Sequence, residues 1–257
     1  MARKPRQASK TGIYHIMVRG INGQSIFYDK DDFKRYLETL DRIITEEEAQ
    51  VFAYCLMSNH VHLLIHEGKT GVSRIMKRLG VSYAHWYNWK YERRGYVFQD
   101  RFKSENVEDD AYLKTVVRYI HQNPVKAGIT KKPEDYIWSS MAAYYGEKEY
   151  PPGLSQTSFI LSLFDHNKES SVNIFRAYME ENEEANCLDH TEQKRLTDRE
   201  AEKLIREILE GQSLTGLKEI AKQDRDEFLR KMKEIEGVSI RQISRLTGIG
   251  STTVYNA

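Results

Sequence analysis

The sequence predicts an α+β protein, in which a ferredoxin-like βαββαβ antiparallel sheet with helices on one face precedes an all-helical C-terminal region. Three observations predict this fold class. Short segments rich in apolar and aromatic residues have the length and the boundaries of strands. Stretches with apolar residues at helical spacing separate these segments. After about residue 145 only helical patterns occur, and the last of them has the pattern of a helix-turn-helix.

Each element of the first region has a local signal. Ser58-Asn59 separates two apolar runs and predicts the turn of a hairpin. Asp109-Asp110 favours a helix start, and Pro124 is expected to end that helix. The expected elements are, in order, a strand over 14–19, a loop over 20–23, a helix over 31–47, strands over 51–57 and 60–66, a helix over 72–91, a strand with an extended approach over 97–107, and a helix over 110–122.

The run Pro151-Pro152-Gly153 marks a boundary. We therefore expect two domains, an N-terminal one over residues 1–148 and a helical C-terminal one over 149–257. The periodicity of the second region predicts helices over 157–164, 173–184, 198–209, 214–221 and 225–236.

A helix-turn-helix is expected at about residues 236–257. Gly248 has the position of the turn between its two helices, and the second helix would present Thr252 and Thr253 to a DNA groove. A helical packing unit without DNA contact is the alternative.

The most informative motif of the chain is His60-Val61-His62. Residues two apart on a strand point to the same face, so both imidazoles can reach one cation. His66 shares their strand parity, but a satisfied surface or core histidine is the simpler interpretation there. His15 is expected to be a structural strand residue near the site.

The helix over 110–122 is expected to complete this site. Tyr119 and Asn123 are four residues apart and share a helix face, so the amide oxygen of Asn123 can reach a metal at which Tyr119 points. His121 is expected to face elsewhere. Tyr112 is the alternative to Tyr119, because a spacing of seven residues returns to nearly the same helix face. Two imidazoles and an amide oxygen suit a hard or borderline divalent ion such as Mg²⁺ or Mn²⁺.

Three motifs together resemble the HUH single-tyrosine transposases, and the most similar branch is that of the REP-associated tyrosine transposases in the insertion-sequence 200-like superfamily. The motifs are the His60-Val61-His62 strand, the segment 97–104 and the helical segment 119–128, and the resemblance covers residues 10 to 145. It implies that Tyr119 attacks a phosphate of single-stranded DNA and stays linked to the 5′ end, leaving a free 3′-OH. It also implies that Asn123 is the third metal ligand beside His60 and His62, and that the DNA forms hairpins.

The charge distribution supports a nucleic-acid partner. The net charge of +1 hides an asymmetry, because residues 1–130 carry 21 Lys and Arg against 15 Asp and Glu. Basic residues also interleave with aromatic ones between residues 74 and 103, a composition typical of single-strand binding. The residues expected to contact DNA in this first region are Arg19, Arg93, Arg94, Arg101 and Lys103.

Composition excludes several other classes of protein. No apolar stretch approaches the length of a membrane span, and the basic N-terminus lacks the apolar core of a signal peptide. The two cysteines, Cys55 and Cys187, cannot form a disulfide framework. A cytoplasmic protein without a membrane partner is the simplest expectation.

The sequence thus predicts a metal-dependent single-strand DNA endonuclease and strand transferase, whose C-terminal helices are a possible duplex-binding element. Three alternatives stay open: a non-catalytic DNA-binding regulator, a phosphodiesterase that activates water, and a replication or plasmid-transfer nickase. The DNA sequence recognised is open, and so is the choice between a monomer and a homodimer.

Overall fold

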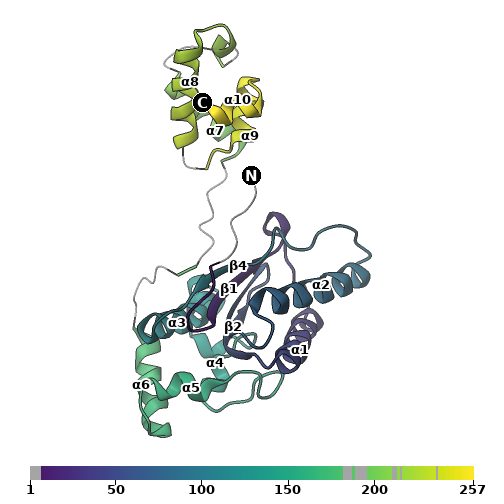
Figure 1. The fold of residues 1–257 in the computed structure, drawn as a ribbon, viewed down its shortest axis with the longest axis vertical. Coiled ribbons are helices and arrows are strands. Elements are labelled where there is room, and N and C mark those ends of the chain that lie inside the picture. The colour runs from purple at the N-terminus through teal and green to yellow at the C-terminus, as the bar shows by residue number, and fades with distance from the viewer. Residues whose placement is uncertain (1–6, 182–186, 189–195, 210–212, 215, 236) are drawn as a thin grey trace. The chain divides into compact units, whose positions relative to one another are not determined.

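The computed structural model of the chain (Figure 1) describes residues 7–181, 187–188, 196–209, 213–214, 216–235 and 237–257. The chain forms two compact units, Met1–Asp189 and His190–Ala257. The boundary expected between residues 148 and 149 falls inside the first unit, because the helices that follow it pack on that unit's core. Among the residues described, no helix has both the length and the apolar character needed to cross a membrane.

The first unit is built on a four-stranded sheet in the order β2-β3-β1-β4, with every neighbouring pair antiparallel. Together with α1 and α2 the strands follow one another as βαββαβ, which is the order that the sequence predicts. The register of β1 on β3 pairs Met17 with His62 and Arg19 with His60. The strands are β1 (Ile13–Arg19), β2 (Gln50–Leu56), β3 (His60–His66) and β4 (Lys103–Asn106).

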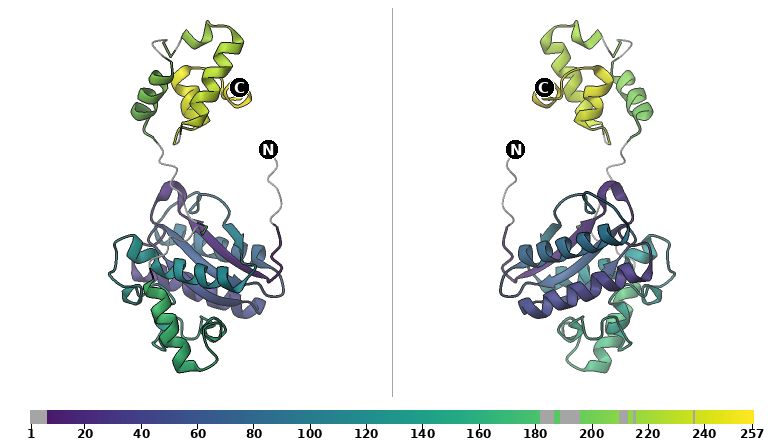
Figure 2. Two further views of the ribbon diagram at one scale, coloured as in Figure 1. Left: turned by 90° about the vertical axis from the view of Figure 1, so that its left-hand side faces the viewer. Right: turned by 90° about the vertical axis from the view of Figure 1, so that its right-hand side faces the viewer.

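Helices α1 (Lys30–Glu47) and α2 (Val72–Lys90) cover one face of this sheet (Figure 2). Strand residues of one parity, such as Ile16 and Leu63, are fully buried in a common core with Leu40 of α1. This alternation fixes which side chains remain for the opposite face.

The opposite face is covered as well (Figure 1). Ile13 and Leu64 of the sheet share a second core with Ile120 of α3. The expectation of helices on one face therefore holds for α1 and α2 only, because later helices bury the apolar strand residues of the other face. These helices are α3 (Asp110–Lys126), α4 (Met141–Tyr144), α5 (Thr157–Ser162) and α6 (Lys168–Glu180).

Helix α3 continues past Pro124, where the sequence predicted its end. A proline has no N–H to donate to the carbonyl four residues earlier, which here belongs to Ile120. The side-chain amide of Asn123 donates to that carbonyl at 3.4 Å and to the carbonyl of Tyr119 at 2.8 Å. Because Asn123 satisfies the backbone in this way, the helix extends through the proline to Lys126.

The last strand is shorter than the predicted segment 97–107. Its approach joins β1 only through an isolated bridge between Phe98 and Gly20, so that a loop connects α2 to β4. Two short 3₁₀ helices, η1 (Ile21–Gly23) and η2 (Pro133–Asp135), complete the elements of this unit.

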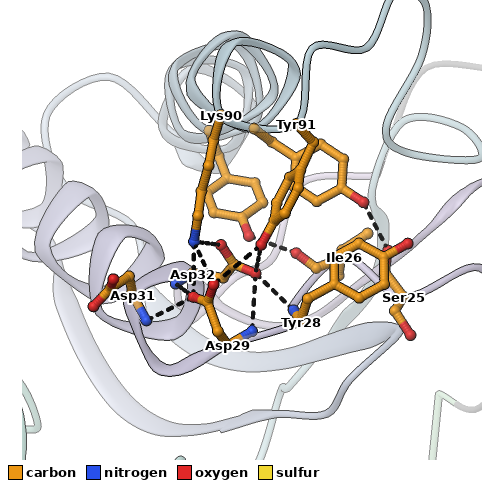
Figure 3. Close-up of polar contacts among 10 residues, drawn as sticks. Ser25, Ile26, Tyr28, Asp29, Asp31, Asp32, Lys90 and Tyr91 are labelled. Atoms are coloured by element: carbon orange, nitrogen blue, oxygen red, sulfur yellow. Dashed lines mark hydrogen bonds and ion pairs between the residues drawn. The ribbon is translucent and has the colours of Figure 1, made fainter.

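A buried carboxylate holds the start of α1 against the end of α2 (Figure 3). Asp32 is fully buried and accepts hydrogen bonds from the Lys90 ammonium and from the Tyr91 hydroxyl, each at 2.7 Å. It also accepts from the backbone N–H of Tyr28 at 2.6 Å. Asp29, the N-cap of α1, accepts from Lys90 as well. This cluster fixes the point from which the loop after α2 departs.

The second unit is helical and has its own core, to which Ile205, Leu229, Ile243 and Val254 contribute. The helix expected over 214–221 is only a 3₁₀ turn, and residues 182–184 and 236 of two other expected helices lie outside the described residues. Its elements are α7 (Asp198–Ile208), η3 (Gly216–Lys218), α8 (Lys222–Glu234), α9 (Ile240–Thr247) and α10 (Ser251–Asn256).

Gly248 adopts a left-handed conformation, with φ of +67°, at the end of α9. A residue with a Cβ is disfavoured there, which explains a glycine between the last two helices. Thr252 and Thr253 lie in the first turn of α10, as expected. Their contact with DNA stays a prediction.

We expect Asp32→Ala to lower the free energy of unfolding of the first unit by about 3 kcal/mol, because it leaves the ammonium of Lys90 and two backbone donors without their buried acceptor. Urea unfolding followed by circular dichroism measures the change. Asp31→Ala is the matched control in the same helical turn, with an exposed side chain and an expected change within about 0.5 kcal/mol. Equal losses for the two variants would contradict a clamp centred on Asp32.

Candidate active site

The two histidines of the motif lie side by side on β3. Their ring centroids are 5.2 Å apart and the rings are nearly perpendicular. His62 is fully buried in the middle of the unit, whereas His60 is partly exposed at the beginning of the strand. The strand therefore presents one sheltered and one accessible imidazole on the same face.

Hydrogen bonds indicate which nitrogen of His60 carries the proton. Its Nδ1 lies 2.7 Å from the side-chain oxygen of Asn59, which can only accept. Nδ1–H is therefore the donor, and Nε2 carries the lone pair with which an imidazole binds a metal.

His62 has a similar arrangement through a second histidine. Its Nδ1 lies 3.1 Å from Nε2 of His15, and Nδ1 of His15 lies 3.8 Å from a carboxylate oxygen of Glu105. The carboxylate favours the proton of His15 on Nδ1 through electrostatic attraction, although 3.8 Å is too long for a hydrogen bond. Nε2 of His15 then accepts from His62 Nδ1–H. This assignment again leaves Nε2 as the nitrogen of His62 that carries the lone pair.

Glu105 is the charged group that faces this pair of histidines. The interaction with His15 holds the pKa of its carboxyl below the ordinary value, and the N–H of Leu188, which donates at 3.0 Å, acts in the same direction. The carboxyl is therefore ionised near neutral pH. Glu105 was not identified from the sequence, because only the register of β4 on β1, which pairs it with His15, brings it to the site.

Tyr119 lies on α3 directly over these histidines. Its ring is edge-on to His62 and to His15, with centroid distances of 5.5 and 5.7 Å. The residue is 4% exposed. The ammonium of Lys126, which was not predicted either, lies 5.0 Å from the centre of the ring. Its position seven residues after Tyr119, on the same helix face, was the available signal.

Asn123 is one turn beyond Tyr119, as predicted. Because its amide nitrogen donates to the helix backbone, the amide group is oriented with its oxygen away from those carbonyls. An amide oxygen is a hard ligand, a type that the two imidazoles of the His60-Val61-His62 motif do not supply.

The donor atoms fit a divalent metal ion. Two imidazole Nε2 atoms and one amide oxygen combine ligands of intermediate softness with a hard oxygen ligand. Among the described residues, no group of three or more His, Cys, Asp or Glu side chains is gathered closely enough to hold a metal. A site at His60 and His62 would therefore need the oxygen of Asn123 or ligands from the substrate.

The alternative residues occupy other surroundings. Burial, with the carboxylate of Glu105 nearby, raises the pKa of the Tyr112 hydroxyl, which disfavours it as a nucleophile. His66 lies at the far end of β3 beside the ring of Phe52. His121 contacts the hydroxyl of Ser140 at 2.7 Å, and burial lowers its pKa to about 3.

The residues expected to bind DNA do not form a single group. Arg19 pairs in register with His60, and Lys103 pairs with Met17 at the edge of the same sheet. Arg94 and Arg101 are exposed around the loop before β4. Arg93 has an internal role, because its guanidinium donates to the Tyr87 hydroxyl and to the Gln24 side chain, both at 3.1 Å. Thr252 and Thr253 belong to the second unit.

Two solved structures are similar to this chain. One solved structure, of a REP-associated tyrosine transposase bound to a REP hairpin, matches with a TM-score of 0.50 at 20% identity, over 59% of this chain and 89% of that one. A candidate transposase from Deinococcus radiodurans R1 matches at 17% identity, over 47% and 97% of the two chains, with a TM-score of 0.34. The fold comparison rests on the first of these. No curated protein sequence matches the chain.

The family model described as IS200-like transposase matches residues 8–123. That segment contains the whole sheet, the histidine motif, Tyr119 and Asn123. Residues 8–123 of this chain are therefore similar to the IS200-like transposase family.

Proposed function

We propose that the protein is a metal-dependent endonuclease and strand transferase of single-stranded DNA. The observation that carries the proposal is the packing of Tyr119 edge-on against His62 and His15, beside the motif histidine His60. A nucleophile that acts on a metal-bound phosphate needs such a donor set beside it.

The phenolic oxygen of Tyr119 would attack the phosphorus of a backbone phosphodiester. A bond then forms between that oxygen and phosphorus, the bond from phosphorus to the 3′ oxygen breaks, and the 3′ oxygen leaves with a proton as a free hydroxyl. The 5′ end stays on the enzyme as a phosphotyrosine, and the reverse attack by a 3′-OH rejoins a strand. A covalent intermediate of this kind conserves the energy of the broken phosphodiester.

His60, His62 and Asn123 would hold the metal, through two Nε2 atoms and one amide oxygen. A bound Mg²⁺ or Mn²⁺ would polarise the phosphate and stabilise its developing charge. The imidazoles favour Mn²⁺ in this pair, because they are softer ligands than the oxygens that Mg²⁺ prefers. Lys126, 5.0 Å from the Tyr119 ring, is a candidate partner for a phosphate oxygen.

The substrate that we propose is a hairpin with a single-stranded flank. The solved relative is bound to a REP hairpin, and this chain shares its fold. Arg19, Arg94, Arg101 and Lys103 are the candidate phosphate contacts in the first unit, and their contribution would decrease with rising salt. In the second unit, α9, the Gly248 turn and α10 are the candidate duplex-binding element, with Thr252 and Thr253 at its surface.

We expect Tyr119→Phe to abolish a covalent protein–DNA adduct, because the variant keeps the ring and its packing but lacks the attacking oxygen. Labelled single-stranded hairpins from the DNA flanking the gene, incubated with Mn²⁺ and run on denaturing gels, measure the adduct. Tyr112→Phe on the same helix is the control and should still form it. Cleavage without an adduct would point to water as the nucleophile, and duplex binding without cleavage would favour a regulator.

We expect Glu105→Gln to weaken Mn²⁺ binding about tenfold, because the neutral amide no longer fixes the proton on His15 and therefore the orientation of His62. Titration followed by electron paramagnetic resonance of free Mn²⁺ measures affinity without any turnover. Glu108→Gln, an exposed glutamate three residues on, is the control and should leave affinity unchanged. Unaltered Mn²⁺ binding in a folded Glu105→Gln protein would contradict this role for Glu105.

A further inference from the structure

The first unit has a concave region whose lining contains none of the site histidines. It is a pocket of about 810 Å³ between α2 and the loop that leads to β4. The size is within the range of small-molecule binding sites. Its apolar lining comes from one side of α2, from the loop and from β1, and includes Met76, Gly80, Ala84, Phe98, Phe102 and Val18.

The wall of the pocket is held by backbone hydrogen bonds. The N–H of Gln99 donates to the carbonyl of Arg19 at 2.9 Å, and the N–H of Ile21 donates to the carbonyl of Val97 at 2.9 Å. On the other side, the amide of Asn88 donates to the carbonyl of Gly95 at 3.0 Å. The loop is therefore tied to α2 and to the end of β1, where Arg19 pairs with His60.

The charges around the pocket favour an anionic partner. Helix α2 contains no acidic residue between Val72 and Lys90. Three of its four cations form ion pairs with α1 or its N-cap: Arg74 and Arg78 with Glu47, and Lys90 with Asp32. The fourth, Lys77, is exposed at the rim of the pocket.

The loop provides a second cation at the rim, the exposed side chain of Arg101, beside one carboxylate, Asp100. Tyr96, which is 83% exposed, also lines the pocket. Aromatic rings flanked by cations are what an unstacked base and its phosphates require. An apolar peptide would leave Lys77 and Arg101 without a function.

We propose that this pocket receives one unstacked nucleobase of the single-stranded flank, with Phe98 and Phe102 contacting the base and with Lys77 and Arg101 contacting the adjoining phosphates. The proposal rests on the proposed function, because it assumes a single-stranded DNA substrate. It adds a base-binding subsite on the side of the sheet that α1 and α2 cover, distinct from the proposed site of cleavage.

Gly80 allows a sharp test. A Cβ added there would lie 3.9 Å from Phe98, which is an ordinary contact, so Gly80→Ala fits whereas the longer side chain of Gly80→Leu would enter the pocket. The probe is a fluorescein-labelled 20-nucleotide oligothymidylate, and anisotropy measures its dissociation constant for the full chain carrying Tyr119→Phe. We expect Gly80→Leu and Phe102→Ala each to weaken binding about tenfold, and Gly80→Ala to leave it unchanged.

Removal of the base that occupies the pocket should weaken DNA binding in the same way as Gly80→Leu, whose side chain fills the pocket. A hairpin fixes the register of its single-stranded flank. With one abasic position placed in turn along that flank, binding to the Tyr119→Phe protein should weaken at one position, whereas the protein that also carries Gly80→Leu should show no such position. If Gly80→Leu and Phe102→Ala bind the intact strand as tightly as the parent protein does, the pocket proposal is wrong. Circular dichroism of each variant identifies a loss of binding that comes from unfolding. In that case Lys77→Ala, which leaves the core intact, is the variant whose change in affinity tests the pocket proposal.

The adduct assay on the protein with Tyr119 intact separates this proposal from the proposed function. Adduct formation with pocket-independent binding would overturn the base subsite alone. Pocket-dependent binding without an adduct would overturn the proposed nucleophile and support the subsite.

Discussion

The antiparallel register of β1 on β3 is the constraint on which the candidate site depends. It pairs Met17 with His62 and Arg19 with His60, so that His15 of one strand lies within hydrogen-bond distance of His62 on the next. A slip of one residue would turn these side chains into the core under α1 and α2. The apolar residues of the other parity, such as Ile16 and Leu63, prevent that slip because they would lose their buried contacts.

Much of this arrangement could be predicted because its signals are local. Strand alternation, the hairpin at Ser58-Asn59 and the spacing from Tyr119 to Asn123 each depend on residues close together in the chain. These signals were sufficient for the order of the elements and for the candidate residues on β3 and α3. The family match over residues 8–123 agrees with them.

The features that could not be predicted from the sequence are those that depend on long-range contacts. Glu105 reaches His15 only because β4 pairs with β1 from a position about ninety residues later, and no local pattern distinguishes it from the other glutamates of the chain. The covered second face was missed for a related reason. The apolar residues of α5 and α6 indicate helices, but they do not indicate that Phe175 is buried in the core under α3. Arg93 was expected to contact DNA, and the sequence did not indicate that its guanidinium donates to Tyr87 and Gln24.

The proline in α3 gives the side chain of Asn123 a conformational anchor. Because Pro124 leaves the carbonyl of Ile120 without its normal donor, the amide nitrogen of Asn123 is drawn to the backbone, and rotation of the amide by half a turn would set two oxygens against each other. Pro124 thus favours one orientation of the side-chain amide of Asn123. A residue with an N–H at position 124 would compete for the carbonyl of Ile120 and leave the amide of Asn123 with its bond to the carbonyl of Tyr119 alone. Preorganisation of a polar group can therefore be encoded in the backbone of the residue that follows it.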